Sequence, residues 1–173
     1  CAEASERVAY DGTVLRPLDT SGLNRLIRRW KREGVESVAV CLLFAYANSA
    51  HEQELKRLLS PHFAVSISSE VAPEFREYER ASTTFLNAYL TPPMTRYLES
   101  LQREARGLGA LRVLLSHSAG GLMDAGRACG HPVSTILSGP AAGVMGAWAV
   151  GRGVGAHRLL TLDIGGTSTD MAL

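Results

Sequence analysis

The segment from residue 163 to residue 173 constrains the fold of this chain more than any other part of its sequence. It reads Asp-Ile-Gly-Gly-Thr-Ser-Thr-Asp-Met-Ala-Leu, and it follows the apolar run Leu159-Leu-Thr-Leu. Apolar runs on both sides of a Gly-Gly dipeptide predict two strands joined by a tight turn. One aspartate stands at each shoulder of that turn, Asp163 and Asp170. We therefore predict a β-hairpin whose loop lies between two carboxylates.

The loop residues suit a phosphate group. Gly165 and Gly166 lack a Cβ and adopt positive φ at no cost, so backbone N–H groups there can approach an anion closely. The two carboxylates could hold a hydrated Mg²⁺ against a nucleotide. Hydroxyl donors fill the rest of the loop: Thr167, Ser168 and Thr169. These features predict a phosphate-binding loop, which is not a Walker A loop because no Gly-Lys-Ser/Thr follows.

An ordinary Gly-Gly hairpin with polar decoration accounts for the same residues, and it is the commonest use of the dipeptide. The loop alone does not decide between the two interpretations. The segment before it, Ser138-Gly-Pro-Ala-Ala-Gly-Val-Met-Gly-Ala-Trp-Ala-Val-Gly, favours the phosphate loop. It predicts a helix with Ser138 as its cap, Pro140 in its first turn and Gly151 at its end.

Small residues in this helix would let it lie close to a neighbouring backbone, and we expect Trp148 to be a core residue. The helix pattern Pro-Ala-Ala-x-x-x-small is followed by a short loop, an apolar strand and Asp-x-Gly-Gly…Asp. This order resembles the connecting helix and second phosphate loop of the actin, Hsp70 and sugar-kinase ATPase superfamily. This resemblance implies that Asp163 lies near the attacking water and the metal. Chaperones of the superfamily carry a glutamate before the helix proline, where this chain has Gly139. The role of that glutamate is therefore either absent here or performed by another residue.

Further segments keep the order typical of one family within that superfamily. They are residues 40–46 with Asn48, His51 and Glu52, then 69–80, 82–92, 96–98 and 138–143. Together they resemble the A subunit of hydantoinase/oxoprolinase proteins. The family typically reads Ser-Asn-Gly-Gly where this chain has Ser118-Ala-Gly-Gly.

The resemblance implies an α/β fold of the actin/Hsp70/sugar-kinase-like ATPase type, with helices and a largely parallel sheet. Residues 1–80 would be the C-terminal part of the hydantoinase A N-terminal domain, and residues 81–173 the start of the main domain. The first phosphate loop of the superfamily is not found. We therefore expect an internal piece of a longer protein.

The resemblance also implies a function: an ATP-dependent hydrolase that opens cyclic amides such as hydantoin or 5-oxoproline, with ATP and Mg²⁺ and with a B-type subunit or fused domain as partner. Asp163 would be catalytic, Asp163 and Asp170 would hold the metal, and the nucleotide would be bound by Gly165, Gly166, Thr167, Ser168 and Thr169. An ATP-dependent ketone carboxylase of the same family and a non-metabolic actin- or Hsp70-like nucleotide switch remain alternatives.

A serine hydrolase is a further alternative. Ser116-His-Ser-Ala-Gly-Gly resembles the nucleophile elbow Gly-x-Ser-x-Gly around Ser118, but Ser116 replaces the first glycine. Nothing in the sequence places His131 or His157 beside Ser118. The charged run around Glu77 and Arg80 predicts a solvated helix start, with a substrate contact from either residue as the alternative.

Composition excludes several classes of protein. The net charge of +1 argues against an electrostatic nucleic-acid partner. Three widely spaced cysteines indicate neither a disulfide framework nor a zinc site, which favours a reducing cytoplasm. No apolar run is long enough for a membrane span.

Elements along the chain are expected to alternate between strand and helix, which favours an α/β fold. We expect a hairpin at Asp11-Gly12, a helix capped by Ser21 and ending at Gly34, and a strand over 38–46. A Ser49-x-x-Glu52 capping box would open a helix to residue 59. Further on we expect a strand over 63–69, helices over 80–90 and 92–106, and strands over 111–115 and 133–137.

Overall fold

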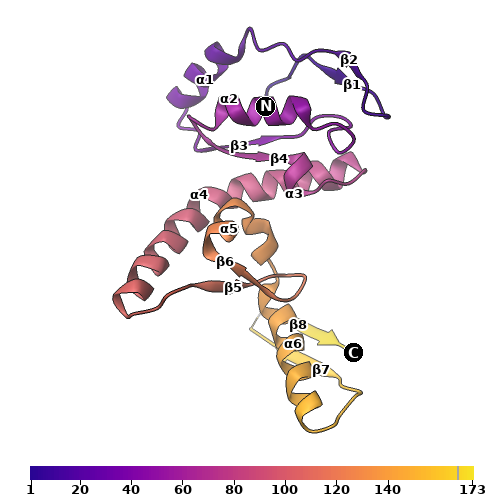
Figure 1. Ribbon diagram of the computed structural model, residues 1–173, viewed down its shortest axis with the longest axis vertical. Helices are drawn as coiled ribbons and strands as arrows, with labels where there is room; N and C mark the ends of the chain where they lie inside the picture. Colours follow the sequence, from indigo (N-terminus) through magenta and orange to yellow (C-terminus); the bar gives the residue numbers. More distant parts are fainter. Residues whose placement is uncertain (167) are drawn as a thin grey trace. The chain divides into compact units, whose positions relative to one another are not determined.

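The computed structural model describes residues 1–166 and 168–173, in which helices and strands alternate along the chain. The chain divides into two compact units, Cys1–Arg96 and Tyr97–Leu173. Figure 1 labels the elements of both units. The family-domain boundary expected after residue 80 stays a prediction.

A β-hairpin opens the first unit. Strand β1 (Arg7–Val8) pairs antiparallel with β2 (Val14–Arg16), as Asp11-Gly12 predicts. Gly12 has a φ of 87°, and a Cβ there would lie 3.2 Å from the carbonyl oxygen of Ala47. The amide of Asn48 donates to the Gly12 carbonyl at 2.8 Å. The turn therefore requires glycine both for its backbone conformation and for this close approach.

The centre of the first unit is a β-α-β arrangement. Strand β3 (Ser37–Val40) runs parallel to β4 (Ala64–Ile67), and the connection between them contains α2 (Ala50–Leu59). Helices α1 (Leu23–Arg32) and α2 lie on one side of this pair, with α4 on the other (Figure 1). The buried core consists of Ile27, Val40, Leu55, Leu59, Phe63 and Ile67. The parallel pair follows from the helical crossover, which parallel strands need.

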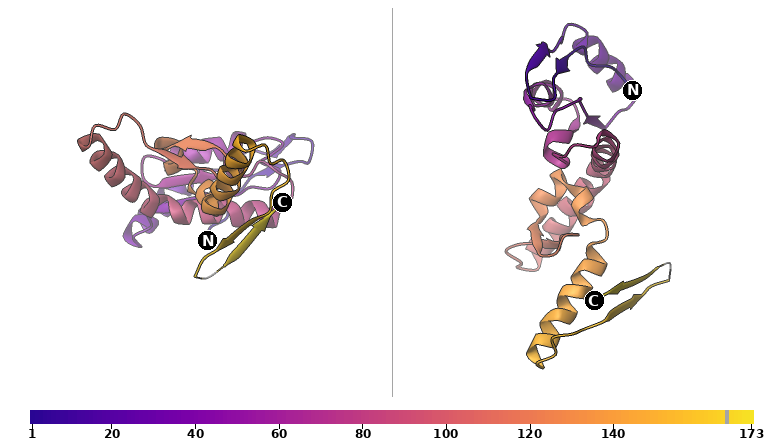
Figure 2. Two further views of the ribbon diagram at one scale, coloured as in Figure 1. Left: turned by 90° about the horizontal axis from the view of Figure 1, so that it is seen from below. Right: turned by 90° about the vertical axis from the view of Figure 1, so that its right-hand side faces the viewer.

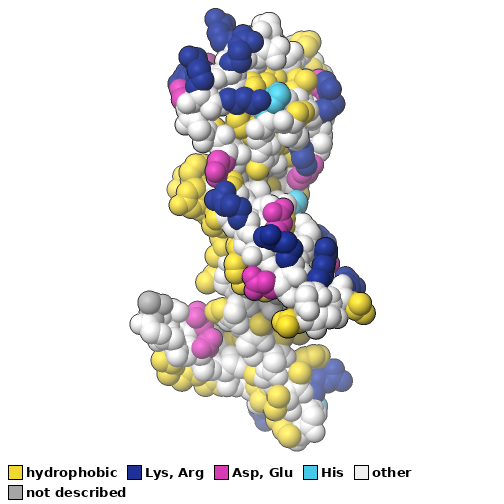
Figure 3. Space-filling view, turned by 90° about the vertical axis from the view of Figure 1, so that its left-hand side faces the viewer, with side chains coloured by type: hydrophobic (Ala, Val, Ile, Leu, Met, Phe, Trp, Pro, Cys, Tyr) yellow, Lys and Arg dark blue, Asp and Glu magenta, His cyan; other side chains and the backbone are white. Residues whose placement is uncertain are grey.

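Helix α1 is strongly amphipathic. Its apolar residues face the core, and Trp30 makes an edge-to-face contact with Phe63 at a centroid distance of 5.9 Å. On the face drawn in Figure 3, basic side chains gather over the first unit, where α1 carries Arg25, Arg28, Arg29, Lys31 and Arg32. The predicted cap is wrong, because the N-cap position is Gly22 and no side chain caps the helix.

The strand predicted over 38–46 is too long. It ends at Val40, and the chain then turns, with Phe44 at a φ of 59°. The capping box at the start of α2 is also wrong, because Ser49 makes no side-chain cap bond and the Glu52 carboxylate turns into the protein. Both errors arise from local patterns that tertiary contacts override.

Two helices were expected around Thr91-Pro92, but one continuous helix, α4 (Glu77–Gly107), contains both Pro92 and Pro93. It follows the short helix α3 (Ser68–Val71). Proline fixes φ near the helical value, so a proline pair can remain in a helix at the cost of backbone hydrogen bonds. The Thr91 hydroxyl donates to the Asn87 carbonyl at 2.7 Å, just before the pair. Helix α4 contributes residues to both units.

The second unit continues with two hairpins and the helices between them (Figure 2). Its elements are β5 (Leu114–Ser116), β6 (Leu122–Asp124), α5 (Ala125–Gly130), the 3-10 helix η1 (Pro132–Thr135), α6 (Ser138–Gly153), β7 (Thr161–Ile164) and β8 (Thr169–Ala172). The strand predicted over 133–137 is therefore wrong. Pro132 opens a helical turn there, and the Thr135 hydroxyl donates to its carbonyl at 2.7 Å.

A largely parallel sheet is not what the described residues form. Their strands make four two-stranded sheets, of which only β3–β4 is parallel. The other three pairs, β1–β2, β5–β6 and β7–β8, are antiparallel. The physical reason is connection length, since strands joined by a tight turn can only pair antiparallel. The mixed helix and strand content stands as expected.

No helix among the residues described here combines the length and the apolar character needed to cross a lipid bilayer.

Candidate functional site

The hairpin predicted at the end of the chain is present. In the β7–β8 register Asp163 lies opposite Asp170, and Ile164 lies opposite Thr169. The Gly165 N–H donates to the Ser168 carbonyl at 2.9 Å and closes the loop. The Ser168 hydroxyl donates to Asp170 Oδ2 at 3.3 Å. Thr167, a predicted phosphate ligand, lies outside the described residues.

The pairing brings the two predicted carboxylates together. Residues directly opposite each other in an antiparallel pair point to the same face, with Cβ atoms about 5 Å apart. Asp163 is exposed and Asp170 is half-buried. The other face of the hairpin is apolar and carries Leu162, Ile164 and Met171, all of them exposed. One face of this small hairpin is therefore acidic and the other hydrophobic.

Two facing carboxylates suit a cation, because like charges directly opposite each other destabilise a hairpin. Throughout the part of the chain that the structure describes, no group of three His, Cys, Asp or Glu could hold a metal ion. Magnesium, however, is usually held by one or two carboxylates, with waters and substrate phosphates completing its shell. The Asp163–Asp170 pair fits that donor set.

The loop does not need glycine at position 166 for its own geometry. Neither Gly165 nor Gly166 has a φ in the left-handed region, contrary to the expectation from the dipeptide. A Cβ added at Gly166 would meet no atom within 4 Å outside its chain neighbours. The absence of a side chain at 166 leaves open space beside the backbone, which is the condition for close approach of an anion.

A cavity of about 530 Å³ lies between the hairpin and α6, and both aspartates line it. In the right-hand view of Figure 2 the hairpin follows the end of α6, and its loop points away from the helix. On the helix side the lining residues are small or apolar: Pro140, Ala141, Gly143, Val144 and Ala147. The sequence predicted the hairpin and the helix separately, but not the space between them. The signal for it was the Pro140-Ala-Ala-Gly run, whose short side chains leave that space empty.

Several details of α6 differ from expectation. Ser138 is its first helical residue, and the N-cap is Leu137, with a φ of 60°. Its close approach to another segment occurs at Gly151, where a Cβ would clash with the Leu159 side chain. Trp148 is not a core residue, because 49% of it is exposed, and the Arg152 guanidinium lies 4.9 Å from its ring.

Ser118 holds a turn together in this structure. Its hydroxyl donates to the Ser134 carbonyl at 2.5 Å, and its N–H donates to the same oxygen at 2.8 Å. His117 Nδ1 accepts from the Ala119 N–H at 2.9 Å. Within the described part of the chain, neither His131 nor His157 is hydrogen-bonded to Ser118. This geometry favours the turn over a nucleophile elbow.

Arg80 belongs to a buried polar network in the first unit. It is 1% exposed, and it donates to the Ser68 hydroxyl and to the Leu42 carbonyl, both at 2.9 Å. Glu52 is fully buried and accepts from Leu42 N–H (2.8 Å), Ser68 Oγ (2.6 Å) and Ser69 N–H (2.8 Å). The Arg80 side chain therefore ties the start of α4 to this network. Glu77 is exposed, as expected of a solvated helix start.

Two family models match the sequence. The model described as "Hydantoinase/oxoprolinase" matches residues 80–173, and the model described as "Hydantoinase/oxoprolinase N-terminal region" matches residues 1–63.

Individual relatives agree with these matches. The chain is 34% identical over 171 residues to the caprolactamase subunit alpha of Pseudomonas jessenii, covering 96% of this chain and 25% of that protein. It is 36% identical over 163 residues to 5-oxoprolinase 1 of Arabidopsis thaliana, covering 92% of this chain and 13% of that protein. The chain thus spans at most about a quarter of the length of these relatives.

Solved structures give the same result. The ATP-dependent caprolactamase from Pseudomonas jessenii superposes with a TM-score of 0.83 at 32% identity, covering 97% of this chain and 25% of that one. The nucleotide-free structure of acetone carboxylase superposes with a TM-score of 0.77 at 27% identity, covering 98% of this chain and 25% of that one.

Proposed function

Because this chain belongs to the hydantoinase/oxoprolinase family, we propose that it forms part of an enzyme that uses ATP to open a cyclic amide. Two of the similar proteins are named for such substrates, since caprolactam and 5-oxoproline are both lactams. The caprolactamase structure is also described as ATP-dependent. Under this proposal the chain adopts part of an actin/Hsp70/sugar-kinase-like ATPase fold.

The observation that carries the proposal is the Asp163–Asp170 pair on the wall of the cavity beside α6. Asp163, at the end of β7, would orient the attacking group. The N–H groups of Gly166 and Ser168 and the Thr169 hydroxyl would hold phosphate. The Gly165 N–H already binds the Ser168 carbonyl, so its part would be to shape the loop. Thr167 keeps its predicted role as a donor.

In phosphoryl transfer the protein mainly positions groups and neutralises charge. A Mg²⁺ ion between Asp163 and Asp170 would offset the charge of the phosphates. ATP would phosphorylate the amide oxygen, which makes the amide carbon susceptible to attack. Water would then open the ring, so that the balance is lactam, ATP and water converted into amino acid, ADP and phosphate.

A hydantoinase B-type partner, as a subunit or a fused domain, belongs to the same proposal. Several relatives are named as subunits, among them the caprolactamase subunit alpha and the acetophenone carboxylase gamma subunit of Aromatoleum aromaticum. A cytoplasmic location and the absence of nucleic-acid and membrane partners stay predictions from composition.

The test is ATP hydrolysis by the longer parent protein together with its B-type partner. The assay would compare no addition, 5-oxoproline, hydantoin, caprolactam, and acetone with bicarbonate. We expect turnover to be stimulated by one of the cyclic amides, with release of the ring-opened product. Hydrolysis of ATP that none of the additions stimulates would instead support a nucleotide switch.

An ATP-dependent ketone carboxylase is the second candidate. The superposition on acetone carboxylase favours it, at a lower TM-score and a lower identity than the caprolactamase match. Stimulation by acetone with bicarbonate, and by no cyclic amide, would establish it in place of the first proposal.

A further inference from the structure

The outer face of α1 carries a stripe of arginines. Its members are neighbours on one side of the helix, because they lie three or four positions apart. This arginine stripe consists of Arg25, Arg28, Arg29 and Arg32, all of them exposed. Lys31 adds a fifth cation to the ten residues of the helix. Figure 3 shows basic side chains gathered over the first unit. One face of α1 is therefore strongly positive.

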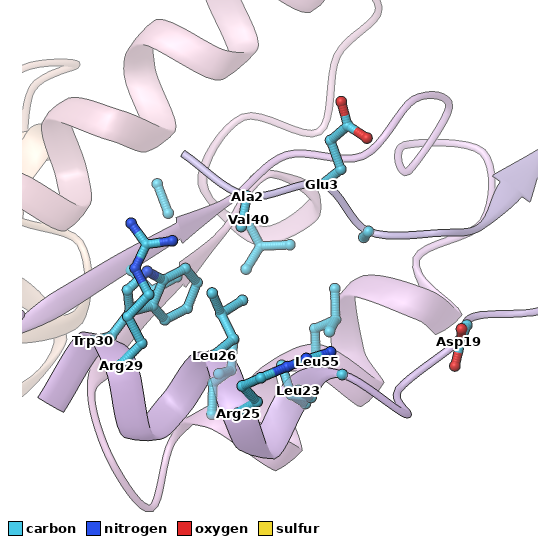
Figure 4. Close-up of a pocket in the computed structure, with 15 residues that line it drawn as sticks. Ala2, Glu3, Asp19, Leu23, Arg25, Leu26, Arg29, Trp30, Val40 and Leu55 are labelled. Carbon is cyan, nitrogen blue, oxygen red and sulfur yellow. The ribbon is translucent and has the colours of Figure 1, made fainter.

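The opposite face of α1 is turned toward the interior of the first unit. Ile27 belongs to the buried core cluster, and Leu23 and Trp30 pack against it. Figure 4 shows Leu26 and Trp30 pointing from α1 toward a cavity of about 370 Å³ that Val40 of β3 also lines. The arginine stripe is thus the face of α1 that other molecules can reach.

The arginine stripe is unfavourable for the helix, because like charges three or four positions apart repel each other. Among the described residues its one ion pair joins Arg29 Nε to Glu33 Oε1 at 2.8 Å. Within residues 1–166 and 168–173, Arg25, Arg28 and Arg32 have no acidic partner. The helix dipole favours cations in the last turn, which accounts for Arg29 and Arg32 only. An acidic partner would offset the repulsion that remains between Arg25 and Arg28.

The residue types of this face also match a protein interface. Four of the five cations of α1 are arginines. Arginine is enriched at protein interfaces, where lysine and glutamate are depleted, and its planar guanidinium group can donate two parallel hydrogen bonds to one carboxylate. A helix face that is only solvated more often alternates charges of both signs. The composition therefore favours contact with carboxylates of another protein.

The charge distribution of the chain disfavours other polyanions. Helix α1 holds five of the 18 Lys and Arg residues, and the chain has 17 Asp and Glu, so the residues outside α1 are net negative. A nucleic acid would extend well beyond this helix, which is about 15 Å long, and would meet that negative charge. A membrane would gain only headgroup contacts, because the apolar face of α1 is turned inward.

We propose that the arginine stripe of α1 docks on an acidic surface of the B-type subunit. The inference rests on the proposed function for the existence of this partner, and several relatives are named as subunits. Carboxylates of the partner would pair with Arg25, Arg28 and Arg32, while Arg29 keeps its bond to Glu33.

Charge reversal in the parent protein tests the proposal. One double variant combines Arg25→Glu with Arg28→Glu. The matched control combines Arg103→Glu with Arg106→Glu, an exposed pair at the same spacing on α4. We expect the first variant to bind a separately purified B-type subunit about tenfold more weakly or worse, and the control to bind as the unaltered protein does. The affinity of the unaltered protein should also fall as ionic strength rises. Equal affinities of the two variants would overturn the proposal.

Arginine footprinting of the unaltered proteins gives a second test that needs no variant. Phenylglyoxal modifies accessible guanidinium groups, and mass spectrometry locates the modified residues. Arg25, Arg28 and Arg32 should react in the parent protein alone and become protected when the B-type subunit is added, while Arg103 should react in both samples.

Protection that is already present in the parent protein alone would overturn the proposal. So would protection by duplex DNA, by phosphatidylserine vesicles or by self-association that the B-type subunit does not produce. Both tests measure binding and not ATP turnover, so a lack of turnover stimulated by lactams would defeat the proposed function without affecting them.

Discussion

The two units of the chain use their carboxylates in opposite ways. In the first unit Glu52 is fully buried, and each of its oxygens accepts hydrogen bonds at 2.6–2.8 Å. In the second unit Asp163 is exposed, and it faces another carboxylate, Asp170, across a hairpin. Glu52 is surrounded by hydrogen-bond donors that the fold supplies, whereas the carboxylates of Asp163 and Asp170 face a cavity and repel each other.

The difference separates a carboxylate that maintains the fold from one that is available for chemistry. A buried carboxylate with a full set of donors is costly to remove, because its donors would be left unsatisfied. Like charges directly opposite each other are unfavourable for folding, and under the proposed function a bound cation would offset their repulsion. Variants at the two places should therefore affect different properties of the protein.

The largest effect is expected from Asp163→Asn in the parent protein. Loss of the negative charge should lower ATP turnover about a thousandfold, as does loss of a key electrostatic group in other active sites. The fold should persist, because Asp163 is exposed. Steady-state ATP hydrolysis and circular dichroism measure the two properties. Asp11→Asn, in the other exposed hairpin loop, is the matched control and should leave turnover intact. Equal ATP turnover in both variants would show that Asp163 is not part of the active site.

Glu52→Ala should have the second-largest effect, on stability. It leaves the Ser68 hydroxyl and the N–H groups of Leu42 and Ser69 without their acceptor, and it should lower the free energy of unfolding by about 3 kcal/mol. Urea denaturation in a Trp148→Phe background would follow Trp30, which lies in the same unit. Glu54→Ala on the same helix removes only an exposed pair with Arg57, and it should destabilise the fold far less than Glu52→Ala does. A similar loss in both variants would contradict the structural role of the network.

Gly166→Ala should have a smaller effect that again distinguishes function from folding. The new Cβ meets no atom within 4 Å, so stability should be unchanged or slightly higher. If phosphate lies against this backbone, nucleotide affinity should fall about tenfold, the equivalent of one hydrogen bond. Calorimetric titration with a non-hydrolysable ATP analogue measures it. A Cβ added at Gly22 also meets no atom within 4 Å, so Gly22→Ala is the control. An unchanged affinity would leave the loop an ordinary hairpin turn.

The smallest expected effect concerns pH. The Thr13 N–H donates to the Asp11 carboxylate at 2.9 Å and lowers the pKa of that carboxyl below its ordinary value of 3.8. Because the folded-state pKa is the lower one, the carboxylate stabilises the fold above the ordinary pKa. This contribution disappears as the pH falls through the folded pKa. Asp11→Asn should abolish this pH dependence, which NMR titration and acid unfolding can detect. An ordinary pKa for Asp11 in the titration would show that the bond is absent in solution.

Local signals were sufficient for some elements. The Asp11-Gly12 and Gly165-Gly166 hairpins were predictable because turn residues and their flanking runs act within a few positions. The apolar face of α1 was predictable from its helical spacing.

Features that depend on distant segments were not predictable. Ser49-x-x-Glu52 has the pattern of a capping box, but donors at Leu42, Ser68 and Ser69 compete for the same carboxylate. The cavity beside α6 requires the helix and the hairpin to meet, and a single sequence does not reveal such a contact. The positive φ of Phe44, in the turn that follows β3, likewise has no local signature.

The register of the last hairpin has a consequence for how this loop could change in length. Asp163 and Asp170 share a face only because the residues between them return the chain to this one pairing. Inserting or deleting a single residue would slip the register by one and turn Asp170 toward the side of the hairpin on which Leu162 lies. Substitutions within the loop can be tolerated one at a time, whereas a one-residue change in length would separate the acids completely. A library that varies loop length should therefore retain function only where the two aspartates remain opposite each other.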